Sequence, residues 1–255
     1  MKMLTIKNVR EISYMRQSGK ILAGVFKIIR ENLREGITTG ELNRIAEEFI
    51  LANGATPTFK GYSGFPGSIC VSVNEELLHG IPSKRVLKNG DIVSVDVGVN
   101  YMGYNTDAAR TMCIGEVSDE AKKVIRVARD SFFEGIKFAT EKNRLHDISC
   151  AIGAHIEANG CGIVRDYVGH GVGANLHEEP DIPNFGRPNT GIRLRRGMTL
   201  AIEPMVNAGS EDVEVLDDGW TVVTADGRLC AHYENTIVIT EGEPEILTLE
   251  DGENA

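Results

Sequence analysis

The amino-acid sequence predicts an α+β protein built from two pseudo-symmetric helix–sheet halves around a central cleft. The first observation is an internal repeat. Ala52-Asn53-Gly54 recurs 106 residues later as Ala158-Asn159-Gly160, and Leu87-Lys88-Asn89-Gly90 recurs 107 residues later as Leu194-Arg195-Arg196-Gly197. The second observation is that two amphipathic helical patterns precede strand-like runs in each half. We expect a single domain over residues 1–255, with repeated halves of about 8–115 and 116–240.

The composition limits the class of protein. Of the 255 residues, 42% are hydrophobic, which suffices for a sizeable core. The net charge of −10 and the pI near 5.2 argue against a general nucleic-acid surface or a surface for acidic membranes. The five cysteines are scattered without a C-x-x-C pair, and the N-terminus lacks an apolar signal region. We therefore expect a cytoplasmic protein with reduced thiols, no membrane span and no direct nucleic-acid binding.

Apolar residues recur with helical spacing in four segments, two in each half. The first helix is expected to start at Asn8 and to end near Glu35-Gly36, and the second to start at Thr38 and to end at Asn53-Gly54. The third is expected to start at Ser118, and the fourth to end at Asn159-Gly160. His155 falls on the inward face of the fourth helix, so we expect a packed, hydrogen-bonded core histidine there, and we expect His146 at the surface.

A hairpin with two aspartates lies at the centre of the first half. The limb 91–98 alternates apolar and other residues, which is the period of a strand, and 105–111 forms the return limb. With the turn centred on residues 100–103, Asp96 and Asp107 are expected to oppose each other on one face. Directly opposed like charges destabilise a strand pair, and a cation between them would remove the repulsion. The pair therefore indicates half of a metal site. The alternative is that one or both aspartates lie at a solvated strand end.

Three further polar residues, Glu203, His170 and Glu234, lie in strand-like or Gly-rich segments whose pattern gives no structural reason for them. The repeat offset carries Asp96 onto Glu203, His170 lies within the Gly-rich run 169–173, and Glu234 lies in the middle of a strand-like stretch. Structural zinc sites prefer cysteine and histidine, whereas four carboxylates and one imidazole offer mainly hard oxygen ligands. They suit two divalent ions about 3.5–4 Å apart, an arrangement that lowers the pKa of a bridging water and gives a hydroxide nucleophile.

Taken together, the motifs resemble methionine aminopeptidase over nearly the whole chain, from about Ile6 to Leu249. They are Asp-Val-Gly at 96–98, Asn-Thr-Asp at 105–107, Gly-His-Gly-Val-Gly at 169–173, Ile-Glu-Pro-Met at 202–205 and Tyr-Glu-Asn-Thr at 233–236. The resemblance implies the pita-bread fold, and a metal-dependent aminopeptidase that removes the initiator methionine from nascent proteins. Co, Mn, Fe, Zn and Mg all tolerate such ligands, so the identity of the two ions stays open.

The resemblance also implies the role of each ligand. Asp107 and Glu234 would bridge the two ions, Asp96 would complete one ion, and His170 and Glu203 would complete the other. Glu203 is also the family's candidate for the general base.

Two further histidines and an apolar pocket match the family. His79 would contact the substrate backbone near the scissile peptide, and His177 would stabilise the oxyanion. The residues that match the family's methionine side-chain pocket are Phe59, Tyr62, Phe65, Cys70 and Trp220. Phe65 replaces a frequent tyrosine, which would change the polarity of the pocket. Gly98 replaces a frequent threonine beside the first ligand, which would weaken a hydroxyl contact.

His232 has no counterpart in this resemblance. It lies two residues from Glu234 on the same expected strand face, so it could hydrogen-bond a ligand. The alternative is a packed or solvated residue, which the usual behaviour of histidine favours.

The spacing of the last two ligands indicates the class within the family. The spacing of 31 positions from Glu203 to Glu234 leaves no room for the helical insertion of the second class. No extension precedes the first helix, so we expect the compact, bacterial-like type I form. The implied partners are nascent polypeptide N-termini, with ribosome docking as a family inference, and we expect a monomer.

Three alternatives remain. An Xaa-Pro aminopeptidase or prolidase has a similar site but normally carries an additional N-terminal domain, and only about five residues precede the first helix here. Non-enzymatic binding proteins on the same fold usually lose ligands, whereas all five positions are kept here. A two-metal phosphoesterase would need basic residues for phosphate, and the motifs offer chiefly Arg110, so it ranks last.

Overall fold

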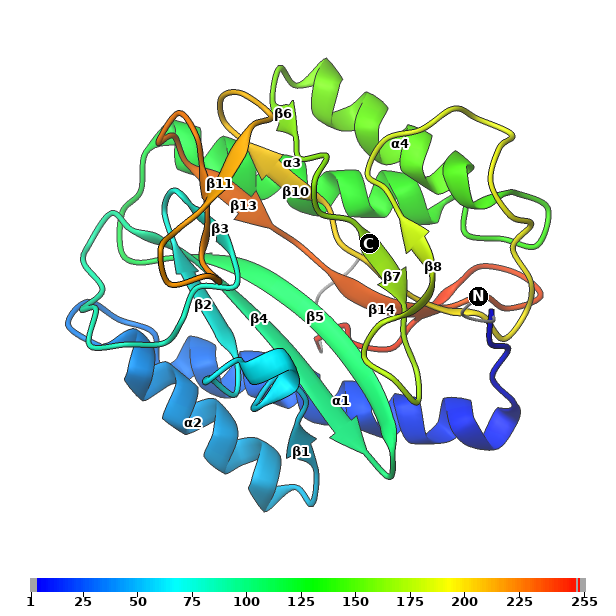
Figure 1. The fold of residues 1–255 in the computed structure, drawn as a ribbon, viewed down its shortest axis with the longest axis horizontal. Coiled ribbons are helices and arrows are strands. Elements are labelled where there is room, and N and C mark those ends of the chain that lie inside the picture. The colour runs from blue at the N-terminus through cyan, green and yellow to red at the C-terminus, as the bar shows by residue number, and fades with distance from the viewer. Residues whose placement is uncertain (1–3, 251, 253–255) are drawn as a thin grey trace.

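The structure is a computed structural model that describes residues 4–250 and residue 252, and it contains two similar halves. In Figure 1, helices α1 and α2 lie along one side of the central strands, and α3 and α4 lie along the other. Strands β4, β5 and β14 run between the two helical layers. The molecule therefore has the predicted α+β architecture.

The elements follow the predicted order. The helices are α1 (Val9–Asn32), α2 (Thr39–Ala52), α3 (Asp119–Ile136) and α4 (Leu145–Ala158), with a short 3-10 turn, η1 (Tyr62–Gly64). The strands of the first half are β1 (Thr56–Pro57), β2 (Cys70–Val73), β3 (Glu76–Leu78), β4 (Ile92–Tyr101) and β5 (Tyr104–Cys113). The strands of the second half are β6 (Gly162–Ile163), β7 (Gly169–Gly171), β8 (Glu178–Ile182), β9 (Thr199–Ile202), β10 (Met205–Asn207), β11 (Val213–Val215), β12 (Val222–Thr224), β13 (Cys230–His232), β14 (Asn235–Val238) and β15 (Glu245–Ile246).

Three helices begin at the predicted caps. The side chains of Asn8, Thr38 and Ser118 each accept a hydrogen bond from a backbone N–H of the first turn, which satisfies donors that a helix leaves free. Helix α1 ends at Asn32, before the predicted Glu35-Gly36, since the chain is already extended at Leu33 (φ −70°, ψ 116°). The predicted boundary was therefore wrong by one helical turn.

The β4–β5 hairpin corrects the predicted strand register. Its turn residues are Met102 and Gly103, both with positive φ (53° and 84°), as a two-residue hairpin turn requires. This places Asp107 opposite Gly98, and Asp96 opposite Ala109. The two aspartates are thus diagonal neighbours on one face instead of directly opposed, because the turn lies one residue later than the sequence pattern indicated.

A second antiparallel ribbon crosses the other half. Strand β9 pairs with β14, and β10 pairs with β13 in the same register, with Ile202 opposite Asn235 and Met205 opposite His232. The ribbon is interrupted between these pairs, at 203–204 on one strand and 233–234 on the other. Pro204 has no N–H to donate, and the amide of Tyr233 donates to the Pro204 carbonyl at 3.1 Å. The prediction that Glu234 lies in mid-strand was therefore wrong: it lies opposite Glu203 at the break.

The hairpin and the ribbon are joined along β5. Ala109 and Glu234 exchange two backbone hydrogen bonds, of 3.0 and 3.3 Å. On either side of this pair, a threonine hydroxyl makes the contacts that a backbone would otherwise make. The Thr111 hydroxyl accepts from the His232 N–H and donates to the His232 carbonyl, and the Thr236 hydroxyl accepts from the Asp107 N–H and donates to the Asp107 carbonyl, all at 2.9 Å. All three pairs share one antiparallel register, so the strands of the two halves form a continuous surface.

The internal repeat recurs in the hydrogen bonding of the structure. An isolated bridge joins Thr38 to Val86, and 106 to 107 residues later another joins Arg144 to Arg193. Each bridge ties the start of a half's second helix to the loop before its central strand, so the repeated sequence builds repeated structure.

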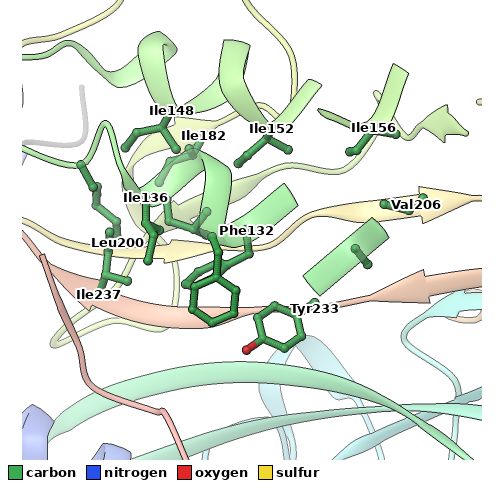
Figure 2. Close-up of a cluster of buried hydrophobic side chains, with 14 of the residues drawn as sticks. Phe132, Ile136, Ile148, Ile152, Ile156, Ile182, Leu200, Val206, Tyr233 and Ile237 are labelled. Atoms are coloured by element: carbon green, nitrogen blue, oxygen red, sulfur yellow. The ribbon is translucent and has the colours of Figure 1, made fainter. Parts of the chain in front are cut away.

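Each half has its own hydrophobic core. One core packs α1 and α2 against β4 and β5, and the other packs α3 and α4 against β9 and β14. Figure 2 shows the second core, in which Phe132 lies beside Tyr233 while Ile148, Ile152 and Ile156 line up along α4. Burial of such side chains is worth about 1.5–3 kcal/mol each, which makes the two cores the main source of stability.

The burial of His146 and His155 only partly matches the predictions from the sequence. His155 is half-buried, so its assignment to the core was wrong. His146 is also half-buried, and its Nδ1 lies 2.8 Å from the Thr190 hydroxyl.

The five cysteines are all free thiols. Within residues 4–250, no helix has the length and apolar character to cross a membrane.

Arg110 stabilises the junction between the halves. Its side chain is 4% exposed, donates to the Glu234 carbonyl at 2.6 Å and to Asn235 Oδ1 at 2.8 Å, and lies 4.3 Å from the centre of the Tyr233 ring. We predict that Arg110→Met lowers the free energy of unfolding by about 2–3 kcal/mol, because buried acceptors lose a charged donor. Urea unfolding measures this.

The matched control for this prediction is Arg126→Met, at an exposed position of α3. It should change the unfolding free energy by less than about 0.5 kcal/mol. Equal stability of the two variants would contradict the role of Arg110.

Candidate metal centre

The first two carboxylates of the site come from the β4–β5 hairpin. Asp96 and Asp107 lie on the same face, and their carboxyl groups are in contact. Asp107 is 4% exposed. Oδ1 of each aspartate is buried without a hydrogen-bond partner among the described residues. Each acid thus brings one buried, unpartnered oxygen atom to the cleft between the halves.

The other two carboxylates come from the break in the ribbon. Glu203 and Glu234 are 8% and 2% exposed, respectively. The Asn184 amide donates to the Glu203 carbonyl at 2.9 Å, and the junction with Ala109 fixes the backbone of Glu234. Irregular backbone at this point turns both side chains toward Asp107 in the same cavity.

His170 approaches the acids from β7. A Cβ on either flanking glycine, Gly169 or Gly171, would come within 2.5 Å of a carbonyl oxygen of a neighbouring strand, so only glycine lets β7 fit there. Nδ1 of His170 lies 2.9 Å from the Gly171 carbonyl, where it can only donate. Nε2 therefore keeps its lone pair, 3.8 Å from Asp107 Oδ2 and 3.7 Å from Glu203 Oε1.

Burial disfavours charge on every one of these groups. It raises the pKa of Asp96 to about 7 and that of Glu203 to about 8. Burial and the neighbouring carboxylates raise the pKa of Asp107 and Glu234 well above the usual range. Burial lowers the pKa of His170 to about 3, so its imidazole is neutral. Such a cluster is stable as anions only with positive charge among them.

A divalent cation fits this observation. Ligand atoms of Asp107, His170 and Glu234 lie within 4.8 Å of one another, and so do those of Glu203, His232 and Glu234. The unpartnered oxygen atoms of Asp96, Asp107 and Glu234 are the donors that such an ion would use. The five residues singled out in the sequence therefore lie in one cavity.

His232 also faces the carboxylates. It is 2% exposed, and its Nε2 lies 3.6 Å from Glu203 Oε2 and 3.8 Å from Glu234 Oε2. Burial lowers its pKa, so this imidazole too is neutral. His232 is therefore packed, as one of the expectations had it, and its ring also faces the carboxylates, as the other had left open. Strand alternation had placed His232 on the face of Glu234, but the sequence could not show that both point inward.

An apolar pocket adjoins the carboxylates in a cavity of about 180 Å³. Four of the predicted pocket residues pack together: Phe59, Phe65, Cys70 and Trp220. The Phe65 ring meets Trp220 edge-on, with centroids 5.1 Å apart. Leu176 and Ile81 complete the cluster. Neither residue was predicted from the sequence, although Leu176 directly precedes His177.

Tyr62 and the two remaining predicted histidines lie around the opening of the pocket. Tyr62 is 40% exposed, and its hydroxyl lies 2.7 Å from His177 Nδ1. The His177 ring stacks edge-on against His170, with centroids 4.3 Å apart. The polar side of the pocket therefore borders the candidate metal ligands.

His79 lies at the same opening in an unusual backbone conformation. Its φ is 58°, a sparsely populated region that often occurs at functional sites. The ring lies edge-on to Tyr167 and Trp220, and burial lowers its pKa to about 4. His79 therefore presents a neutral imidazole to the cavity.

The fold and this cluster define a metallopeptidase: the chain belongs to metallopeptidase family M24, which it matches over residues 13–241. A methionine aminopeptidase from Clostridium perfringens (strain 13 / Type A) is 58% identical over 97% of this chain and 99% of that protein. Methionine aminopeptidase 1 from Bacillus subtilis (strain 168) is 53% identical over 96% of this chain and 99% of that protein.

Solved structures confirm the predicted pita-bread fold. The crystal structure of a methionine aminopeptidase from Thermotoga maritima has a TM-score of 0.95 at 48% identity, covering 97% of this chain and 100% of that chain. A prolidase from Pyrococcus furiosus has a TM-score of 0.78 at 24% identity, covering 96% of this chain and 66% of that chain. The second likeness shows the fold alone.

The structure explains the glycine beside the first ligand. A Cβ at Gly98 would lie 2.6 Å from the Phe59 ring and 2.9 Å from Thr58 Cβ. Phe59 is 7% exposed and fills the space that a larger residue at 98 would need. Gly98 therefore decides how closely the wall of the pocket approaches β4.

We predict that Gly98→Ala displaces Phe59 and destabilises the fold by about 1–3 kcal/mol, as overpacking does. Thermal unfolding measures the stability, and a crystal structure of the variant would show the ring. The control is Gly242→Ala, where a Cβ would meet no atom within 4 Å. An unmoved Phe59 ring and an unchanged melting temperature would contradict the prediction.

Proposed function

We propose that this protein is a methionine aminopeptidase of type I, a hydrolase that removes the N-terminal methionine from polypeptides. The observation that carries the proposal is the junction of two sites in one cavity: buried carboxylates and an imidazole beside a pocket of aromatic rings and a thiol. Aromatic walls suit a thioether, since sulfur makes favourable contacts with rings. The names of the relatives at 58% and 53% identity support this substrate.

The proposed cofactors are two divalent metal ions. Asp107 and Glu234 would bridge them, Asp96 would complete one, and His170 and Glu203 would complete the other. When bound, these ions would supply a water acidic enough to act as hydroxide at neutral pH. Co, Mn, Fe, Zn and Mg all suit such donors to differing degrees. Nδ1 of His170, held by the Gly171 carbonyl, keeps Nε2 directed at the acids.

The protein's own residues would carry the remaining steps. Glu203, which lies in the same cavity, would act as the general base and pass the proton to the leaving amine. His177 would donate a hydrogen bond to the developing oxyanion, since Tyr62 fixes its ring at the pocket opening. His79 would hold the substrate backbone near the scissile peptide. The methionine side chain would enter the cluster around Phe65 and Trp220.

We propose that the substrates are the N-termini of nascent polypeptides and that the protein acts in the cytoplasm as a monomer, with docking on the ribosome. Five free thiols support a reducing compartment. The repeated halves joined along β5 support one catalytic unit over residues 1–255, with halves of about 8–115 and 116–240.

Two alternatives are disfavoured. A proline-directed peptidase shares the fold, but the prolidase likeness of 24% identity is far below the identities to methionine aminopeptidases. A non-enzymatic binding protein would have no need of three carboxylates, Asp96, Asp107 and Glu234, that each hold a buried oxygen atom without a partner among the described residues.

The proposed function predicts metal-dependent release of methionine. Metal-stripped protein, resupplied with Mn²⁺ or Co²⁺, should cleave Met-Ala-Ser and leave Ala-Pro-Ser intact, because the apolar pocket holds the first side chain. Chromatography of the products measures this, and Asp107→Asn is the inactive control. Release of alanine from Ala-Pro-Ser would favour the proline-directed alternative, and no cleavage by metal-loaded protein would favour a binding protein.

The oxyanion role of His177 predicts a change in turnover. His177→Gln should lower kcat by about 10²–10³ with the metal content unchanged, because one donor to the transition state is lost. Steady-state kinetics on Met-Ala-Ser and metal analysis measure the two quantities. His146→Gln, at a half-buried histidine bonded to Thr190, is the control. An unchanged kcat would exclude His177 from the mechanism.

A further inference from the structure

The register of the strands places His232 in a defined relation to the carboxylates. Asp96 lies opposite Ala109, Ala109 pairs with Glu234, and Glu234 lies opposite Glu203. These positions form one row across four strands. His232 lies two residues from Glu234 along its strand, on the same face of the sheet, with its neighbour Thr111 two residues beyond Ala109.

His170 stands on the other side of that row. It lies opposite Ala201, which in turn lies opposite Thr236, and Thr236 is bonded to Asp107. The carboxylates of Glu203 and Glu234 are thus flanked by an imidazole on each side along the sheet. The sequence motif accounts for His170 alone.

The two imidazoles lie at nearly the same distances from their acids. Nε2 of His170 lies 3.8 and 3.7 Å from carboxylate oxygens of Asp107 and Glu203. Nε2 of His232 lies 3.8 and 3.6 Å from carboxylate oxygens of Glu234 and Glu203. Glu203 faces His170 through Oε1 and His232 through Oε2. Donor atoms at this spacing can bind one cation between them, since metal–nitrogen and metal–oxygen bonds are each about 2.0–2.2 Å.

No hydrogen bond to a described residue accounts for the burial of the His232 ring. Both ring nitrogens are buried without a hydrogen-bond partner among the described residues. Its backbone is held on one side by Thr111 and on the other by the pairing with Met205. Leaving a buried polar atom unpartnered is unfavourable, and a cation bound to Nε2 would remove that penalty for Nε2.

We propose that His232 is a sixth ligand of the metal centre and binds, through Nε2, an ion that Glu203 and Glu234 also hold. This inference rests on the metal binding of the proposed function, but not on its substrate. A second imidazole makes the centre richer in nitrogen. Its preference therefore moves toward Zn²⁺, Co²⁺ or Fe²⁺ and away from Mn²⁺ and Mg²⁺, which favour oxygen.

The competing explanation is a hydrogen bond from His232 to the Glu203 carboxylate that only positions the acid. It predicts a similar loss of metal affinity on mutation, since residues that orient ligands change affinity by about 10–100-fold. Affinity alone therefore does not separate the two. A direct metal–nitrogen bond does.

The decisive experiment uses full-length protein with labelled imidazole nitrogens, loaded with a spin-active isotope of cadmium. We expect two imidazole nitrogen resonances split by coupling to the metal. His232→Gln should remove one of them, and His170→Gln should remove the other. His146→Gln is the control and should leave both. A single split resonance in the unmutated protein, or two that persist in His232→Gln, would overturn the proposal.

Metal competition provides an independent readout that needs no peptide substrate. His232→Gln should weaken Zn²⁺ binding by at least about tenfold more than Mn²⁺ binding, because only the nitrogen-preferring ion loses a favoured donor. Isothermal titration measures both ions. An unchanged ratio of the two affinities would contradict ligation by His232. Failure of peptide cleavage would leave both results intact and would count against the proposed substrate alone.

Discussion

The pairing of Ala109 with Glu234 is the constraint on which the rest of the structure depends. These two backbone hydrogen bonds join a hairpin from one half of the chain to a ribbon from the other. Threonine hydroxyls continue the same register on both sides, and the Arg110 guanidinium bonds the Glu234 carbonyl. Because side chains alternate along strands, one fixed register decides which face every neighbouring residue presents. A slip of one residue would turn the carboxylates of Asp107 and Glu234 away from each other.

The same junction explains how so many acids can be buried together. Like charges at this distance repel, and each carboxylate would gain by moving to water. They stay because their backbones belong to elements anchored in two separate hydrophobic cores, which supply far more free energy than the cluster opposes. The anchored backbones thus preorganise oxygen and nitrogen donors within one cavity. Such preorganisation reduces the cost of binding the ion in the required geometry.

The sequence predicted the layout well because the layout is repeated. The helix caps, the order of elements and the offset that links Asp96 to Glu203 all follow from local patterns, and the structure agrees with them. The errors concern backbone geometry that apolar periodicity does not show. The hairpin turn lies one residue from its expected centre, since Met102 accepts a positive φ that the pattern had not required.

The metal centre was harder to predict completely, for a related reason. Glu234 lies at a break in its ribbon, where Pro204 removes a donor from the facing strand, and a strand pattern alone does not show such a break. His232 carries no motif of its own, so its role depends on which side of the sheet becomes the cleft. The residues that matched a motif were found, and the one that depends on register alone was underestimated.

Register also links the metal centre to the apolar pocket. Cys70 of β2 lies opposite Asp96 of β4, so a wall of the pocket and a candidate ligand share one cross-strand pair. Burial and the nearby acids raise the pKa of the Cys70 thiol, which keeps it neutral. A neutral thiol binds metal weakly, which favours a place for Cys70 in the proposed pocket and leaves metal binding to oxygen and imidazole. On the other side of Asp96, Gly98 lets Phe59 close against the same strand. Cys70 of β2 and Asp96 and Gly98 of β4 therefore connect the proposed pocket to the candidate metal ligands. A substitution that shifts β4 would be expected to change specificity and metal binding together.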